Sequence, residues 1–260
     1  MEKKLIILGV GVVAVLILIV AVPLGVMFWP LKPTFIDRCK ELNGYDCETW
    51  WGAFEQAYVG KDPRKVHMED YDNFIKAVNF SAEPNKLMFW SKTKDVVHAF
   101  TKKKKDCFLT VEDTALGYML DGLMSWCGKE GCTKTFRKIG CPGWKENNAV
   151  GSFWNRVSAA FADAARGDVT AMLNGDIDTP FNPNSTFATI EVKRFDSPKV
   201  KSLTVVLVTG KSAVTNCKNA SLKDLQRELK KGIAYNCKEV TEAQLEECSS
   251  NPERPCGACW

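Results

Sequence analysis

Histidine is scarce in this chain of 260 residues, which has only two. Neither His67 nor His98 stands in a His-x-x-x-His or Glu-x-x-His pattern, which argues against a histidine-rich metal site and against a zinc protease. The signatures G-x-G-x-x-G, G-x-x-x-x-G-K-[ST] and G-x-S-x-G are absent as well. The sequence therefore gives no support to a nucleotide held as a cofactor or phosphoryl donor.

A strong excess of charge of either sign is also missing. The chain has 35 Lys and Arg against 31 Asp and Glu, a formal net charge of +4. Spread over the whole chain, this charge is too weak to indicate a nucleic-acid partner. With 45% hydrophobic and 25% charged residues, the composition also excludes an intrinsically disordered protein.

The longest stretch without charge lies at the N-terminus, from Leu5 to Leu31. Its apolar core of about 25 residues would form a helix of about 37 Å, enough to cross a bilayer, whereas a cleaved signal peptide usually has only about 7–15 apolar residues. We therefore expect a transmembrane signal anchor over residues 5–31, after a short cytoplasmic tail of residues 1–4. Lys3 and Lys4 favour this orientation. It predicts a single-pass type II protein of the plasma membrane with its main part extracellular or luminal.

Cysteine, by contrast, is abundant. All eleven cysteines follow the apolar segment, and three N-x-[ST] acceptors accompany them at Asn79, Asn184 and Asn219. The combination is typical of an oxidising compartment and predicts a disulfide framework and N-glycosylation. Spacing alone leaves the connectivity open. The close pairs that would be easiest to join are Cys39 with Cys47, Cys127 with Cys141, Cys217 with Cys237 and Cys248 with Cys256.

The chain after the anchor divides into two parts by pattern. Residues 32–168 are mainly helical, with apolar residues at helical spacing in 48–58, 71–78, 110–127 and 151–165. Residues 169–260 have strand-like runs at 169–173, 186–192, 200–208 and 233–237, and an amphipathic helix at 221–231. The predicted fold class is a two-lobe α+β ectodomain, in which a helical N-terminal lobe precedes a small α/β lobe with a parallel sheet. A cleft between two such lobes is a usual place for a ligand.

Carboxylates and aromatic residues at the ends of elements are the remaining candidates for chemistry. They are Glu112, Asp113, Glu191, Trp90 and Trp154. Each also has a structural interpretation: Thr110 with Asp113 matches a capping box, the tryptophans fit a core, and Glu191 fits a solvated strand end. The run 102–105 of lysines fits a solvated loop better than a phosphate-attracting rim. These patterns alone indicate a membrane-anchored, extracellular two-lobe protein and leave a carboxylate hydrolase open.

A series of segments in fixed order resembles one known family. The segments are MFWS (88–91), TVEDT-x-LGYM (110–119), WCG (126–128), CPGW (141–144), SFW (152–154), MLNG (172–175) and STFATIEV (185–192). In this order and spacing they are similar to the ADP-ribosyl cyclase/cyclic ADP-ribose hydrolase family, and most similar to its vertebrate type II membrane ectoenzymes. The resemblance covers about residues 34–255. It implies a helical lobe, an α/β lobe and an active site in the cleft between them.

The resemblance also implies roles for individual residues. Glu191 corresponds to the catalytic glutamate, and Glu112 belongs to the acidic pair that assists it. The implied substrate-binding residues are Trp90, Ser91, Lys92, Asp113, Asp121, Trp154, Thr186 and Phe187. Trp154 would stack on a nicotinamide ring while Glu112 or Asp113 accepts a hydrogen bond from its carboxamide.

The implied reaction is cleavage of the nicotinamide N-glycosidic bond of NAD+, with NAD as substrate rather than cofactor and with no metal. Nicotinamide is already a cationic leaving group, so the site needs to stabilise an oxocarbenium-like sugar, which a buried carboxylate can do. Water, adenine or another pyridine can then attack. Because Thr186 stands where the mollusc cyclase has an aromatic residue, we expect mainly ADP-ribose with some cyclic ADP-ribose, and the resemblance also implies hydrolysis of cyclic ADP-ribose. The implied partners are NAD+, NADP+, cyclic ADP-ribose and nicotinamide, and a homodimer is compatible with the resemblance.

Two other functions stay open. One is a catalytically silent receptor or adhesion ectodomain, against which the intact Glu191, Trp90 and Trp154 argue. The other is a retaining glycosidase that acts on other sugars with Glu112 and Glu191 as its carboxylate pair.

The chain also departs from the family pattern. Lys92 stands where relatives often have arginine, which loses the two-pronged phosphate contact. Four cysteine positions of the vertebrate ectoenzymes are occupied by Pro63, Pro84-Asn85, the region 146–147 and Arg166. Cys107, Cys132 and Cys259 have no counterpart. We expect a bridge between Cys107 and Cys132, which would leave one odd thiol at Cys256 or Cys259.

Overall fold

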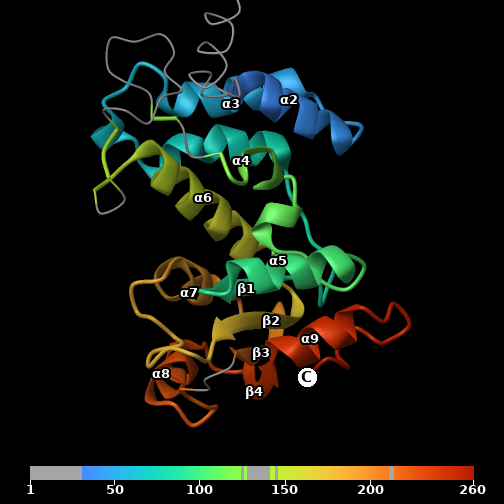
Figure 1. The fold of residues 1–260 in the computed structure, drawn as a ribbon. Coiled ribbons are helices and arrows are strands. Elements are labelled where there is room, and N and C mark those ends of the chain that lie inside the picture. The colour runs from blue at the N-terminus through green and yellow to red at the C-terminus, as the bar shows by residue number, and fades with distance from the viewer. Residues whose placement is uncertain (1–30, 124–125, 128–140, 144–145, 211–213) are drawn as a thin grey trace, which may run out of the picture.

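The computed structural model describes residues 31–123, 126–127, 141–143, 146–210 and 214–260. A mostly helical half is stacked on a half built around one sheet (Figure 1). The helical half contains α2 (Leu31–Glu41), α3 (Cys47–Tyr58), α4 (Asp72–Val78) and α6 (Ala149–Asp163). The sheet consists of β1 (Met88–Ser91), β2 (Gly167–Asn174), β3 (Val200–Thr209) and β4 (Ala234–Thr241). Associated with it are α5 (Lys94–Lys103), α7 (Val192–Arg194), α8 (Ala220–Glu228) and α9 (Glu242–Ser249).

The predicted tail and anchor, residues 1–4 and 5–31, lie outside the described residues apart from Leu31, with which α2 begins. In the part of the chain that is described, no helix is long and apolar enough to cross a membrane.

All four strands are parallel and follow chain order across the sheet. Val205, Val206 and Leu207 in β3 are fully buried, because both faces of this strand are covered, as the continuous apolar run predicts. The strand β1 comes from the part of the chain predicted to be mainly helical. It pairs with β2, with Trp90 opposite Met172. The sheet thus draws on both sides of the expected boundary at residue 168.

Helix α6 joins the two halves. Near its start, Phe153 packs on Phe54 of α3, with ring centroids 5.5 Å apart in the aromatic core of the helical half. Two turns later, Phe161 packs on Phe89 of β1 at 5.1 Å. The residues between them on the neighbouring face, Trp154 and Ser158, therefore lie where the two halves meet.

The predicted helix over residues 110–127 does not form. The described part of this segment has two 3₁₀ turns, η3 (Val111–Asp113) and η4 (Tyr118–Leu120). The chain folds back so closely at Gly117 that a Cβ there would lie 2.7 Å from the carbonyl oxygen of Val111. Only glycine fits this contact, and a continuous helix would abolish it.

The predicted strand over residues 186–192 is also wrong. Residues Phe187–Glu191 form a π-helix, η5, which runs directly into α7. The hydroxyl oxygen of Ser185 accepts a hydrogen bond from the Ala188 N–H at 3.1 Å and so starts the helical turn. In a strand, Phe187 and Glu191 would be about 13 Å apart. The helical turn instead brings them onto one face, about one turn apart.

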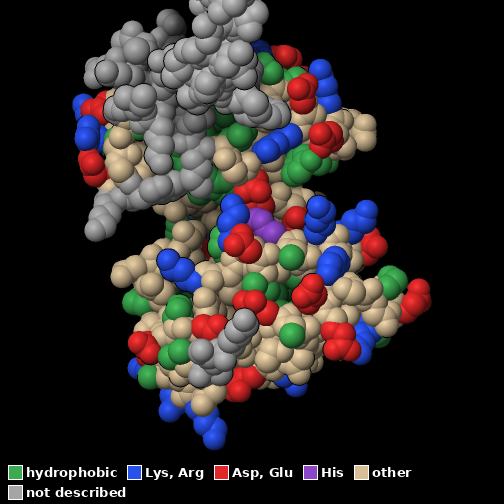
Figure 2. Space-filling view, viewed as in Figure 1, with side chains coloured by type: hydrophobic (Ala, Val, Ile, Leu, Met, Phe, Trp, Pro, Cys, Tyr) green, Lys and Arg blue, Asp and Glu red, His purple; other side chains and the backbone are tan. Residues whose placement is uncertain are grey.

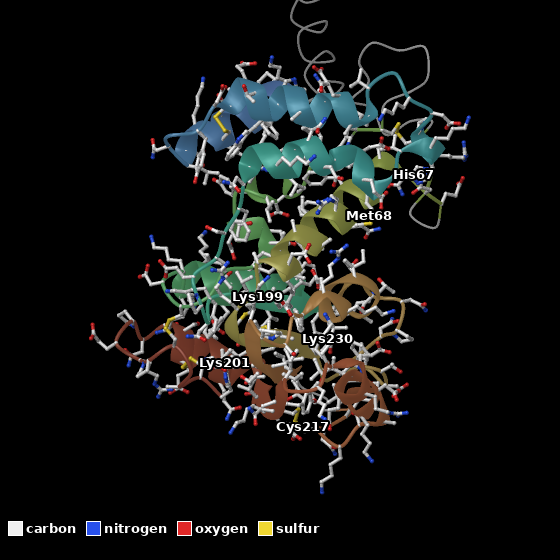
Figure 3. All side chains as sticks on the ribbon, turned by 180° about the vertical axis from the view of Figure 1, so that it is seen from behind. His67, Met68, Lys199, Lys201, Cys217 and Lys230 are labelled. Carbon is white, nitrogen blue, oxygen red and sulfur yellow. A yellow bond between two sulfur atoms is a disulfide. The ribbon has the colours of Figure 1, made fainter. Side chains whose placement is uncertain are left out.

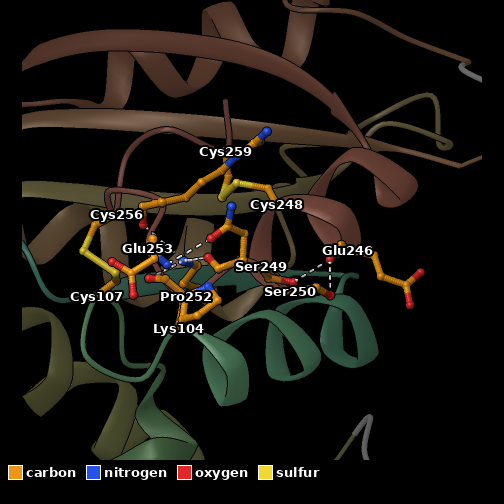
Figure 4. Close-up of a disulfide and its surroundings, with 12 residues drawn as sticks. Lys104, Cys107, Glu246, Cys248, Ser249, Ser250, Pro252, Glu253, Cys256 and Cys259 are labelled. Carbon is orange, nitrogen blue, oxygen red and sulfur yellow. Dashed lines mark hydrogen bonds between the residues drawn. A yellow bond between two sulfur atoms is a disulfide. The ribbon is translucent and has the colours of Figure 1, made fainter.

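Five disulfides are present among the described cysteines, and three are predicted pairs: Cys39–Cys47, Cys127–Cys141 and Cys217–Cys237. The pair Cys248–Cys256 is wrong, because Cys248 bonds to Cys259 and Cys256 bonds to Cys107 (Figure 4). The expected bridge between Cys107 and Cys132 and the odd thiol at Cys256 or Cys259 are therefore wrong as well. Cys132 itself lies outside the described residues.

The C-terminal segment turns back across α5, which is why sequence spacing failed to identify these pairs. The Lys104 ammonium donates hydrogen bonds to the carbonyl oxygens of Asn251 and Arg254 at 2.6 and 3.1 Å. Trp260 packs on Phe100 and Phe108, with centroids 5.7 and 5.3 Å away. These contacts bring Cys256 next to Cys107, 149 residues earlier in the chain.

Polar contacts lie at the four positions where the resemblance places additional cysteines. Near Pro63, Arg64 pairs with Glu146 at 2.8 Å, and the Asn147 amide donates to the Val66 carbonyl oxygen at 2.9 Å. At the other site, the Asn85 N–H donates to the Arg166 carbonyl oxygen at 3.1 Å. These polar contacts join the segments around residues 63–66 and 146–147 and the segments around residues 85 and 166.

Candidate active site

A cleft of about 380 Å³ lies where the two halves meet, at the carboxyl end of β1. Of the ten residues predicted to act on or bind substrate, all but Asp113 line it. The lining consists of Trp90, Ser91, Lys92, Lys94, Val111, Glu112, Asp121, Trp154, Ser158, Ser185, Thr186, Phe187 and Glu191. Figure 2 shows acidic, basic and histidine side chains gathered between the two halves. Parallel sheets commonly bind ligands beyond the carboxyl ends of their strands.

Glu191 comes from η5 and is almost completely buried, with 6% of its surface exposed. Burial raises the pKa of Glu191 to about 8, and the negative charge of Glu112 adds to this rise, while a hydrogen bond with Ser158 opposes it. A cation bound beside this carboxyl group would favour its ionised form. Glu191 is therefore suited to respond to positive charge that develops in the cleft.

Glu112 comes from η3 and is also buried, but its pKa shifts in the opposite direction. Its Oε2 atom accepts a hydrogen bond from the Trp90 indole N–H at 3.2 Å and lies 3.5 Å from Nε2 of His98. Burial by itself would raise the pKa of Glu112, but the adjacent positively charged His98, together with the hydrogen bond from the Trp90 indole, holds it below its ordinary value. One cleft therefore holds two glutamates whose pKa values are pushed apart, a common basis for dividing roles between two carboxylates.

Asp113 has the structural role that its sequence pattern allows. Its Oδ2 atom accepts hydrogen bonds from the backbone N–H and the hydroxyl of Thr110, at 2.9 and 2.8 Å, as a capping box. Its side chain lies beside a neighbouring hollow of about 620 Å³ rather than in the cleft. The structure therefore gives no support to Asp113 as a substrate-binding residue.

The other end of the cleft carries hydroxyl groups and cations. Ser91 ends β1, and Lys92 follows it with a left-handed backbone, φ 60°, which turns the chain into α5. The carbonyl oxygen of Lys92 accepts a hydrogen bond from the Asn174 amide at 3.1 Å, which stabilises this conformation. Lys94 pairs with Asp121 at 3.2 Å. This end can bind phosphate groups, since hydroxyls and ammonium groups are ordinary phosphate ligands.

Sequence reasoning missed several lining residues: Lys94, Val111, Ser158 and Ser185. His98, which the sequence motifs rejected as a metal ligand, contacts Glu112 from outside the cleft lining. Helical spacing carried a usable signal for two of them. Ser158 follows Trp154 by four residues on α6, and His98 follows Lys94 by four residues on α5, so each pair shares a helix face.

Comparisons with known proteins agree with this geometry. The family model described as ADP-ribosyl cyclase matches residues 30–257. The chain belongs to the ADP-ribosyl cyclase family. The mouse protein named ADP-ribosyl cyclase/cyclic ADP-ribose hydrolase 1 is 34% identical over an alignment of 276 positions, which covers 95% of this chain and 90% of the mouse protein.

Solved structures from two branches of the family share the fold. Porcine CD38, in complex with a covalent intermediate, ribo-F-ribose-5'-phosphate, has a TM-score of 0.76 at 34% identity, covering 82% of this chain and 96% of that one. The Aplysia cyclase, in complex with the substrate NGD and the product cGDPR, has a TM-score of 0.74 at 30% identity, covering 89% and 96%. The family resemblance and the prediction that the chain is an enzyme of this family are confirmed.

Proposed function

We propose that this protein cleaves the nicotinamide N-glycosidic bond of NAD+ and passes the ADP-ribosyl group mainly to water. The observation that carries the proposal is the pair of buried glutamates with opposite pKa shifts, placed in one cleft with Trp90 and Trp154. Membership of the ADP-ribosyl cyclase family supports this substrate class.

Glu191 stabilises the sugar cation in this reaction. As the bond to nicotinamide opens, positive charge moves onto the ribose, and a buried carboxylate beside it lowers the energy of the transition state. A carboxylate oxygen of Glu191 can then bond to the sugar cation and trap it as an ester. The covalent intermediate named for porcine CD38 supports this second step.

Glu112 and Trp154 hold the leaving group. Trp154 lines the cleft from α6 and offers its face to the nicotinamide ring, while the ionised Glu112 accepts a hydrogen bond from the carboxamide. Trp90 fixes Glu112 through its indole N–H and shields the ribose from water. Ser91, Lys92 and Thr186 contact the phosphates and adjoining ribose. The same cleft accepts NADP+ and hydrolyses cyclic ADP-ribose.

The products depend on which nucleophile reaches the sugar. Thr186 is exposed beside the buried Phe187 at the start of η5, so no aromatic side chain at this position folds the adenine back onto the ribose. Water attack then gives ADP-ribose as the main product, adenine attack gives a minor cyclic product, and another pyridine gives base exchange. Chromatography of the products from NAD+ tests this, and cyclic ADP-ribose as the major species would contradict it.

The catalytic part faces the cell exterior or a lumen behind an N-terminal anchor. The five disulfides among described residues support an oxidising compartment. Asn79 and Asn184 are exposed and can carry glycans. Asn219 is less suited to carry a glycan in the fold, because its amide nitrogen donates to the Asp178 carbonyl oxygen and to Thr215 Oγ1, at 3.0 and 2.6 Å.

A further inference from the structure

Helix α5 places two basic side chains against the carboxylates of the cleft. Lys94 and His98 are four residues apart and share one face of the helix. Lys94 Nζ lies 3.2 Å from Asp121 Oδ1, and His98 Nε2 lies 3.5 Å from Glu112 Oε2. Lys102, four residues further on, lines the adjoining hollow together with His98.

His98 contacts both Trp90 and Glu112 in this position. Its ring meets the Trp90 ring edge-on, with centroids 5.8 Å apart and planes at 84°. Trp90 and His98 approach the same oxygen of Glu112, one by a hydrogen bond and the other at ion-pair distance. The side chains of His98 and Glu112 are 24% and 9% exposed, so water screens this pair only partly.

We propose that His98 is a positioning residue, whose protonated imidazole holds Glu112 as a carboxylate in the orientation that receives the nicotinamide carboxamide. The inference rests on the proposed function, because it names what keeps the leaving-group acceptor charged and in place. It also gives a role to a histidine that matches none of the usual sequence motifs.

The charges around His98 favour its protonated form. Glu112, Asp113 and Asp121 face it from the segment 111–121 and raise its pKa, and Tyr118, Lys102, Lys105 and Asp106 line the same hollow. The carboxylate of Glu112, at ion-pair distance, is the main cause that raises the pKa of His98, while burial opposes it. The imidazole is therefore charged below this raised pKa and loses its charge as the pH rises through it. Its charge also offsets that of Glu112, which would otherwise raise the pKa of Glu191 further.

The kinetic test compares the full-length wild type with His98→Gln across the pH range. Glutamine matches a neutral imidazole in polarity but never carries charge. We expect kcat/KM to fall roughly tenfold where His98 is charged, as for loss of a close contact to a charged group, and the ratio of wild type to variant to approach one as the pH rises through the raised pKa of His98. A ratio that stays constant with pH would indicate a merely structural role and overturn the proposal. His67→Gln is the matched control, since His67 is exposed in the helical half, where Figure 3 labels it.

A second test requires no turnover. The chain has only two histidines, so an NMR titration of the imidazole signals gives two curves, and His67→Gln assigns them. The His98 curve should have a raised midpoint in the wild type and a lower one in Glu112→Gln. An unchanged midpoint in Glu112→Gln would refute the pairing. Absence of NAD+ cleavage by the wild type would refute the proposed function instead, so the two failures are distinguishable.

Discussion

The buried Glu191 should destabilise the folded protein at neutral pH. Its pKa rises from an ordinary value of 4.5 to about 8 on folding, mainly through burial. The unfolded chain therefore ionises first, and stability falls as the pH rises from about 4.5 to about 8. The raised pKa of Glu191 lowers the free energy of unfolding by about 3 kcal/mol at pH 7 and by less than about 1 kcal/mol at pH 5. Glu191→Gln replaces the acid by a neutral group of the same shape and should remove this penalty.

Thermal unfolding of the full-length protein in detergent measures the effect. For a chain of this size about 1 kcal/mol corresponds to about 2–4 °C, so the Tm of Glu191→Gln should exceed that of the wild type by roughly 6–12 °C at pH 7. The difference should shrink towards pH 5. A Tm difference that does not change with pH, or a variant that is less stable at pH 7, would refute the argument.

Glu112→Gln is the matched control because its sign is opposite. The pKa of Glu112 is lowered in the fold, so its carboxylate contributes stability above its ordinary pKa, and this contribution disappears as the pH falls. The variant should therefore be less stable than the wild type at pH 7 and approach it in acid. Two glutamine substitutions in one cleft would then change stability in opposite directions.

Three further predictions follow from the cleft and its supports. Lys92→Arg restores a two-pronged phosphate ligand at the cleft, so KM for NAD+ should fall a few-fold with kcat unchanged in steady-state assays; a higher KM would contradict this. Replacing Cys107 and Cys256 by serine opens a link across 149 residues and should lower stability by up to about 5 kcal/mol, about twice the loss for Cys39 and Cys47, whose separation is 8; equal Tm losses would argue against the chain-entropy reasoning. In cells that glycosylate asparagine, Asn184→Gln should increase gel mobility and Asn219→Gln should not, since the Asn219 amide is already engaged.

The helices and strands that are defined by burial were predictable from the sequence. The aromatic residues of α3 and the apolar run of β3 identify buried elements by their period, and both elements form where expected. The short β1 was missed, because four residues within a helical region give too little pattern to identify a strand. Its place in the sheet depends on pairing with β2, which lies almost 80 residues later.

The errors arose where tertiary contacts override local preference. The β-branched and aromatic residues of 186–192 favour a strand, but burial of Phe187 against Phe89 and Phe181 and the hydrogen bond from Ser185 favour a helical turn. Similarly, the pairing of Cys107 with Cys256 depends on how the C-terminal segment packs on α5. The roles of the site residues came from the family resemblance, whereas the role of His98 depends on its distance from Glu112, which helical spacing from Lys94 only hints at.

Cleavage of a fluorescent etheno-NAD by the purified full-length protein tests the central claim most directly. Wild type, Glu191→Gln and the exposed control Glu253→Gln should be compared at equal concentration. The wild type and the control should release fluorescent product at similar rates. Glu191→Gln should be slower by roughly 10²–10³-fold or more, as when a group that stabilises transition-state charge is removed. No turnover by the wild type would contradict the enzyme assignment, and full activity in Glu191→Gln would contradict the catalytic role of Glu191.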